Sequence, residues 1–147
     1  MAYTLQAFIG DVSTLTDVLG VLPSLRLPQN KLLIPLTSSV RAAAGGIPFL
    51  PFTDEGSTAV PEALSTLSET LSLNGIVAYV EAEIFGGSGA QAMFVAERGR
   101  LLLGPIVADH AINAALRAIG VVNDGSTDEF EALHLGNHRD TEDWLPT

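Results

Sequence analysis

Hydrophobic and polar positions alternate most regularly in the middle of the chain, where every second residue from Ile76 to Ile84 is apolar. Such alternation is typical of a β-strand, because successive side chains of a strand point to opposite faces of a sheet. A glycine-rich loop connects this segment to a second strand-like segment at Gln91–Glu97. Arg98-Gly99 then forms a two-residue turn into a third at Arg100–Leu103. Three successive strands with short loops predict an antiparallel meander over about residues 76–104.

The segments on either side of the meander predict further strands and helices. Tyr3–Ile9 and Leu32–Leu36 are short and apolar, which favours strands. Apolar residues recur at helical spacing over 12–19 and over about 59–73, and a third helix is expected to begin after Asp109 as its N-cap. Short loops around the meander exclude a doubly wound parallel sheet, which needs helical crossovers. The sequence therefore predicts an α+β fold: a largely antiparallel sheet with helices packed on one face.

The length of 147 residues fits a single domain that spans residues 1–147. Hydrophobic residues make up 47% of the chain and charged residues only 16%, which excludes disorder and leaves apolar surface for contact with a second copy. We therefore expect a homodimer. No apolar run approaches the ~18 residues that would span a membrane. The chain has no cysteine, and its first residues lack the basic region of a signal peptide. These features predict a cytoplasmic protein without a membrane partner.

The net charge of −10 results from seventeen acidic and seven basic residues. A protein that binds nucleic acid needs cationic side chains to contact the phosphate backbone, so the net negative charge excludes a nucleic-acid partner. An acidic surface instead attracts basic proteins and accelerates their encounter, or serves only to keep an apolar domain soluble. The sequence therefore predicts an unknown protein partner, which is basic if the charge takes part in recognition.

Tyr79, Glu81 and Glu83 share one face of the central predicted strand. Side chains two residues apart on a strand lie roughly 7 Å from each other, and paired carboxyl groups can act as acid and base when their pKa values differ. If this face is open to solvent, which we favour, the glutamates form an ordinary polar surface. If the face is covered, they must be paired or catalytic, because an isolated buried charge is costly.

The last fifth of the chain gathers two of the three histidines and the only tryptophan. His134 and His138 are four residues apart, and together with nearby acids they form a candidate metal-binding or catalytic pair. The glycine and asparagine between them disfavour the helix that would bring both imidazoles to one side. We therefore expect no metal or cofactor. In the simpler arrangement, His138 and Arg139 pair with Asp140 or the acids after it, and Trp144 packs the tail onto the sheet.

The loop Gly86–Gly89 lacks the features of a phosphate-binding loop or of a hydrolase nucleophile. No Gly-Lys-Ser/Thr follows it, and it joins two predicted strands rather than leading into a helix. Ser88 stands in a Gly-Ser-Gly context, whereas a nucleophile elbow needs Gly-x-Ser-x-Gly before a helix. This loop therefore carries no reaction signature.

Two motifs mark the C-terminal half: Val80-Glu-Ala-Glu-Ile-Phe-Gly-Gly87 and His138-Arg-Asp-Thr-Glu-Asp-Trp144. In these motifs, and in Gly104-Pro105 and Ala111–Arg117 between them, the chain resembles a group of small uncharacterised bacterial proteins. That group has no established activity, ligand or catalytic residue, so the resemblance implies none here. It implies a bacterial protein in which the acidic strand and the tail belong to one recurring unit.

Two classes of function stay open. The first, which we favour, is a non-enzymatic binding protein whose partner meets the face of Tyr79, Glu81 and Glu83 or the tail. Bacterial immunity-type proteins, which neutralise basic toxins, are similar in size and charge. The second is a hydrolase or lyase that uses Glu81, Glu83 and the histidines, with or without a metal. An enzyme needs these side chains to converge in a concave site, whereas a binding protein needs only an exposed patch.

Overall fold

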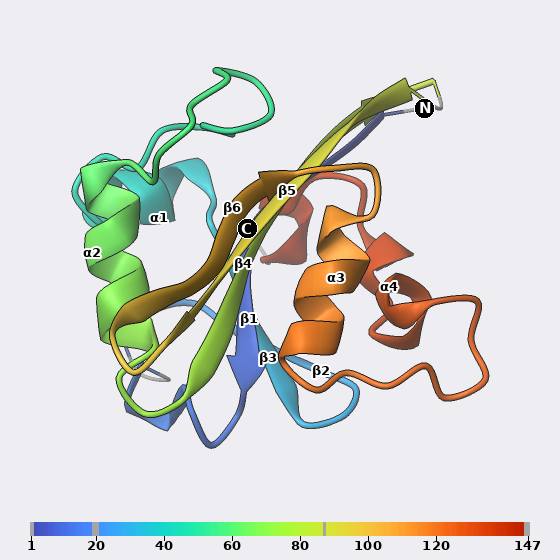
Figure 1. The fold of residues 1–147 in the computed structure, drawn as a ribbon, viewed down its shortest axis with the longest axis horizontal. Helices are drawn as coiled ribbons and strands as arrows, with labels where there is room; N and C mark the ends of the chain where they lie inside the picture. Colours follow the sequence, from blue (N-terminus) through green and yellow to red (C-terminus); the bar gives the residue numbers. More distant parts are fainter. Residues whose placement is uncertain (1, 19–20, 87, 146–147) are drawn as a thin grey trace.

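The computed structural model describes residues 2–18, 21–86 and 88–145. Within them the chain forms a six-stranded sheet in the order β2-β3-β1-β4-β5-β6, and every neighbouring pair is antiparallel (Figure 1). The strands are β1 (Ala2–Asp11), β2 (Leu25–Leu27), β3 (Lys31–Pro35), β4 (Ile76–Phe85), β5 (Ser88–Glu97) and β6 (Arg100–Val107). This architecture confirms the predicted α+β class with a largely antiparallel sheet.

Helices cover both faces of the sheet, which corrects the expectation that they pack on one face. On one side lie α1 (Ser38–Ala43) and α2 (Glu62–Leu71), and on the other α3 (Ala111–Ala118) and α4 (Glu129–Ala132) (Figure 1). The reason is visible in β4, where Val80 belongs to the core under α3 and Tyr79 to the core under α2. Both faces of this central strand are buried, so both need cover.

The strands of the predicted meander form with the predicted turn. β4 pairs with β5 along its whole length, and the chain then reverses at Arg98 (φ 54°) and Gly99 (φ 79°). Left-handed backbone at both turn positions matches the twist of the strands on either side. β6 continues to Val107, beyond the expected end at Leu103.

The helices differ in detail from those expected. Over 12–19 a turn and a short 3₁₀ helix, η1 (Thr16–Val18), replace the α-helix, and the last of these residues lies outside the described ones. A threonine hydroxyl bonds the backbone in this segment, which competes with a helix. His110, rather than Asp109, is the N-cap of α3. The helix expected over about 59–73 is the shorter α2. Among the described residues, no helix has the length and apolar content to cross a membrane.

The C-terminal tail docks on the edge of β1 that β3 leaves uncovered, since β3 pairs only with the second half of β1. The N–H of Thr4 donates to the Arg139 carbonyl (2.8 Å), and the N–H of Gln6 donates to the Thr141 hydroxyl (3.0 Å). A 3₁₀ helix, η3 (Thr141–Trp144), follows, and Trp144 is only 6% exposed in the core under α3. The tail is therefore part of the fold, as the simpler interpretation predicted.

Trp144→Ala is expected to lower the free energy of unfolding by about 3–5 kcal/mol, the usual cost of removing a large buried aromatic side chain. Urea unfolding followed by circular dichroism measures this loss. Asp143→Ala changes an exposed neighbour in the same 3₁₀ helix and is expected to cost less than about 0.5 kcal/mol. An unfolding midpoint equal to that of the wild type in W144A would contradict a docked tail.

Candidate functional site

Glu81, near the centre of β4, is completely buried. The irregular segment 47–53 lies over it and directs two backbone N–H groups at its carboxylate, from Thr53 (2.9 Å) and Phe52 (3.4 Å). The hydroxyl groups of Thr53 (2.6 Å) and Tyr79 (2.7 Å) donate to the same carboxylate. These donors replace the water that a buried carboxylate loses. The face is therefore covered, which corrects the favoured interpretation of an open polar surface.

Gln6 of β1 extends this network to the rest of the covering segment. Its side-chain N–H groups donate to the Pro48 carbonyl (3.0 Å) and to the Tyr79 hydroxyl oxygen (3.1 Å), and its side-chain oxygen accepts from the Leu50 N–H (3.4 Å). Segment 47–53 contains two prolines and cannot pair as a central strand. Side chains of the sheet thus supply the hydrogen bonds that a neighbouring strand would otherwise provide.

The carboxyl groups at this end of β4 influence one another. Burial, followed by the adjacent Glu81 carboxylate, raises the pKa of Tyr79 well above its ordinary value of 10.0, so the hydroxyl stays protonated and donates. Glu83 lies nearer to solvent. Desolvation by partial burial, followed by the Asp54 carboxyl group and then Glu81, raises the pKa of Glu83 above its ordinary value of 4.5. Among the described residues, the carboxyl groups of Asp54, Glu81 and Glu83 form no ion pair with a Lys or Arg.

This geometry gives Glu81 a structural role. A general acid or base must reach its substrate directly or through one water. Glu81 is 0% exposed, and the groups that contact its carboxylate belong to the protein itself. The carboxylate holds segment 47–53 against the sheet and orients the Tyr79 hydroxyl. Of the three predicted residues on this face, only Glu83 is partly accessible from solvent.

The two tail histidines do not join the glutamates. Trp144 belongs to the core under α3, whereas Glu81 contacts residues of the core under α2. His138 packs edge-on against Trp144 with 4.6 Å between the ring centroids, and His134 is exposed. No group of three metal-ligating side chains lies together within residues 2–18, 21–86 and 88–145.

The tail acids bind backbone N–H groups at the starts of helices. Asp140 accepts from the N–H of Glu142 (3.0 Å) as the N-cap of η3. Glu142 accepts from the N–H of Ser38 (2.9 Å), where α1 begins. The expected ion pairs of His138 and Arg139 with these acids are not formed among the described residues. These acids therefore help to fasten the tail to the rest of the fold.

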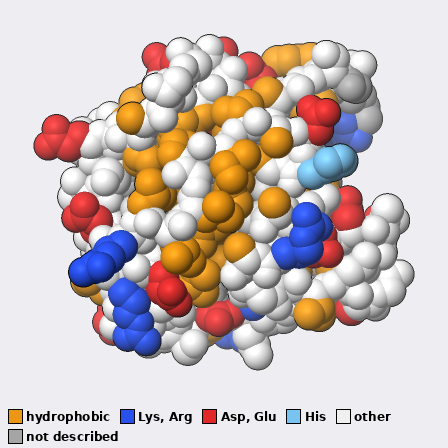
Figure 2. All heavy atoms as spheres, in the orientation of Figure 1, with side chains coloured by type: hydrophobic (Ala, Val, Ile, Leu, Met, Phe, Trp, Pro, Cys, Tyr) orange, Lys and Arg blue, Asp and Glu red, His pale blue; other side chains and the backbone are white. Residues whose placement is uncertain are grey.

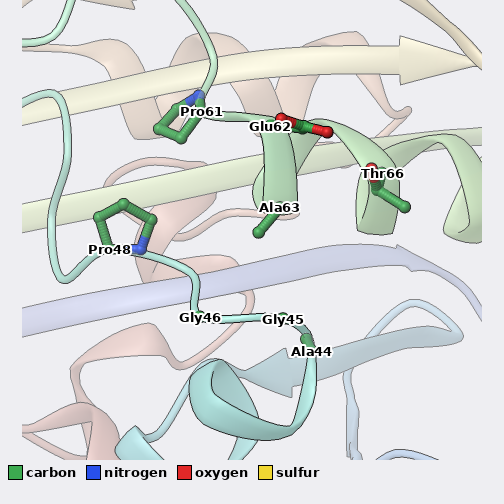
Figure 3. A pocket seen from close by; sticks show the side chains of 8 residues that line it. All are labelled: Ala44, Gly45, Gly46, Pro48, Pro61, Glu62, Ala63 and Thr66. Atoms are coloured by element: carbon green, nitrogen blue, oxygen red, sulfur yellow. The ribbon is translucent and has the colours of Figure 1, made fainter.

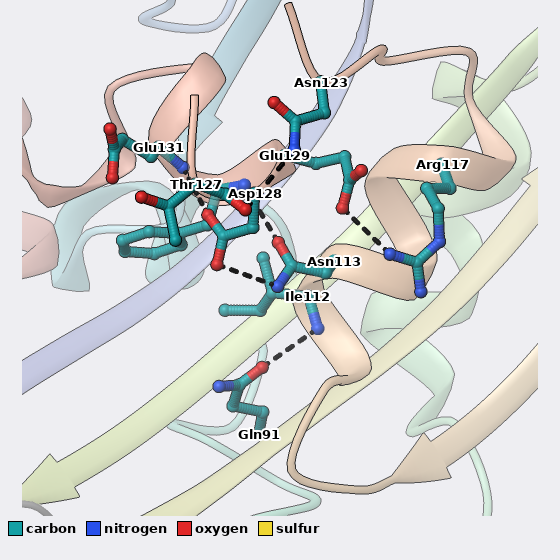
Figure 4. A network of polar contacts seen from close by, with 10 residues as sticks. Gln91, Ile112, Asn113, Arg117, Asn123, Thr127, Asp128, Glu129 and Glu131 are labelled. Atoms are coloured by element: carbon teal, nitrogen blue, oxygen red, sulfur yellow. Dashed lines mark hydrogen bonds and ion pairs between the residues drawn. The ribbon is translucent and has the colours of Figure 1, made fainter. Parts of the chain in front are cut away.

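A second polar network joins α4 to α3 (Figure 4). The side-chain amide of Asn113 donates to the Asp128 carboxylate (3.2 Å) and accepts from the Phe130 N–H (2.9 Å). Arg117 forms an ion pair with Glu129 at 2.8 Å. Each of these side chains is engaged in holding one helix to the other, so the network is structural.

Neither of the two cavities beside α2 is lined by converging catalytic groups. One of about 450 Å³ lies between the 44–48 loop and the start of α2, and Glu62 is the one titratable residue in its lining (Figure 3). Another, of about 310 Å³, lies between α2 and β6. Phe94, Leu101 and Pro105 line it from the sheet, and Glu69 is its charged residue on α2.

The exposed apolar strand β6 is a feature that the hydrophobic pattern alone did not reveal. None of its eight residues is buried. Its large hydrophobic residues have the following exposed fractions: Leu101 52%, Leu102 58%, Leu103 41%, Ile106 38% and Val107 55%. Figure 2 shows the resulting stripe of hydrophobic side chains on the face where β6 lies nearest the viewer. The sequence feature that could have indicated this exposure is an apolar run in the last strand of a meander. Such a strand lies at the edge of the sheet unless another strand pairs with it.

Comparison of the chain with family models, with curated proteins and with solved structures found no match. The geometry is therefore the evidence that bears on function. Within the described residues it offers a distinct apolar surface at β6 and no set of converging catalytic side chains.

Glu81→Ala is expected to destabilise the protein by about 3 kcal/mol or more, because several buried donors lose a shared charged acceptor. Tyr79→Phe removes one of these donors and keeps the ring, so its expected cost is about 1 kcal/mol. Urea unfolding of both variants measures the two costs. If E81A were as stable as Y79F, Glu81 would not be the acceptor that holds segment 47–53.

Glu83→Gln is expected to stabilise the protein increasingly as the pH rises. The pKa of Glu83 is higher in the folded than in the unfolded chain, so ionisation of this group costs stability. That cost is absent below the ordinary value of 4.5 and complete above the folded pKa. Thermal unfolding of the wild type and E83Q in a pH series measures it. A difference in Tm that does not change with pH would show that Glu83 is not perturbed.

Proposed function

We propose that the protein is a cytoplasmic protein-interaction module that performs no chemistry and binds a partner protein over β6. The observation that carries the proposal is the exposure of large hydrophobic side chains along one strand, Leu101–Val107. Contiguous apolar surface of this kind is uncommon on monomeric proteins and marks interaction sites.

The size of the surface is compatible with a stable contact. A standard interface buries about 800 Å² per partner. Eight residues of strand extend for about 26 Å at 3.3 Å per residue and form the axis of such a patch. Removing its apolar part from water contributes about 25 cal/mol per Å². Arg98, Arg100 and Asp109, which are exposed at or next to the two ends of the strand, supply the polar rim that interfaces have around an apolar centre.

The hydrolase or lyase alternative has no geometric support among the described residues. The protein's own donors surround Glu81, and His134 and His138 belong to the tail. An immunity-like role against a basic protein rests on size and charge alone. A binding function that uses β6 requires neither the glutamates nor the histidines to act on a ligand.

Photo-crosslinking from position 102 tests the proposal in the cell that makes the protein. A photoreactive phenylalanine analogue in place of Leu102, which is 58% exposed, is expected to form covalent adducts with a protein on irradiation. The same analogue in place of Glu131, exposed on α4, serves as the matched control and should form few. Adducts no more abundant from position 102 than from position 131 would contradict the proposal.

A further inference from the structure

We propose that the partner of β6 is a second copy of this chain, packed antiparallel about a two-fold axis through the Gly104–Pro105 peptide. This inference rests on the proposed function, because it names the occupant of the β6 surface. A two-fold contact needs a patch that is complementary to itself after half a turn. The charges, the apolar side chains and the backbone of β6 each meet this requirement.

The charged residues at the two ends of β6 have opposite signs. Arg100 begins the strand and Asp109 follows its end, and both are exposed. Among the described residues, neither forms an ion pair. The two residues are equally far in sequence from the Gly104–Pro105 bond. Antiparallel packing about that bond therefore places Arg100 of each copy beside Asp109 of the other.

The same alignment matches the apolar side chains. Leu101, Leu102 and Leu103 precede the proposed axis, and Ile106 and Val107 follow it. With the copies antiparallel, Leu103 of one faces Ile106 of the other. In each copy these two residues stand opposite Val95 and Met93 of β5, on the side of the sheet that α3 covers. Leu101 and Val107 stand opposite Ala96 and Ala92, on the side that α2 covers. The two-fold axis therefore brings apolar side chains together on the α3 side of the edge.

The backbone of β6 favours a dimer of only two copies over a series of copies whose sheets pair edge to edge. Its pairing with β5 skips Leu102 and shifts again between Leu103 and Ile106. Gly104 in this interval has a φ of 89°, and Pro105 has no N–H to donate. Bulges and prolines are means by which edge strands avoid unlimited pairing. The contact would therefore be made by side chains. A single two-fold contact uses the β6 side chains of both copies and leaves none for a third copy.

Local charge favours a second copy over a basic protein. The whole chain has a net charge of −10, but residues 97–109 contain two acids and two arginines, so their charges cancel. Glu69, across the cavity on α2, is a further acid close to the strand. Attraction to the acidic surface would direct a basic protein elsewhere, whereas a second copy meets little repulsion at this nearly neutral patch.

Charge reversal at the two ends tests this arrangement by sedimentation velocity. Arg100→Asp brings acids together at both ends of the dimer, and Asp109→Arg brings bases together, so each alone is expected to weaken dimerisation about tenfold or more. An equimolar mixture of the two variants should recover the dimer, because each supplies the charges that the other needs. Arg26→Asp, on β2 at the opposite edge of the sheet, is the matched control and should dimerise like the wild type.

Three outcomes would overturn the inference: a wild type that stays monomeric up to about 100 µM, single variants that dimerise as tightly as R26D, or a mixture that stays monomeric. Recovery in the mixture also shows that both variants are folded. The proposed function is tested separately. A monomeric wild type that still crosslinks from position 102 to a different protein would keep that function and reject the second copy. A chain that forms neither a dimer nor such crosslinks would reject both.

Discussion

Cover on both faces of the sheet is the constraint on which this structure depends. Most residues of β1 and β4, at its centre, are buried, so apolar side chains point to both sides. α3 and the C-terminal elements fill one side, and α1, α2 and segment 47–53 fill the other. β6 carries the same kind of side chains but has none of its residues buried. Apolar side chains are therefore removed from water at the centre of the sheet but remain exposed to water at this edge.

Polar groups attach the two irregular segments that complete the cover. Segment 47–53 is held by Glu81 and the tail by β1, and Gln6 serves both. Its backbone N–H binds the tail at Thr141, while its side chain binds Pro48 and Leu50 of the covering segment. Buried hydrogen bonds of this kind are costly to leave unmade and so fix one arrangement. Glu81 and Tyr79 of β4 thus take part in attaching the segment that covers them.

The meander could be predicted from local features of the sequence. The alternation of apolar and polar residues and the Arg98-Gly99 turn depend only on residues that lie close together in the chain. The burial of Glu81 was not predictable, since it depends on Thr53, which is 28 residues away in sequence. The exposure of the β6 leucines is likewise a tertiary property, because a strand's hydrophobicity does not show how far the covering helices reach. The short helices of the tail were missed because they are too brief to display a helical period.

The central claim is that a second copy covers β6 in solution. Hydrogen–deuterium exchange of the wild type at low and at high protein concentration tests it most directly. We expect the amides of residues 100–107 to exchange more slowly at high concentration, while those of α4, away from β6, exchange equally at both. Exchange in β6 that is independent of concentration would contradict the claim.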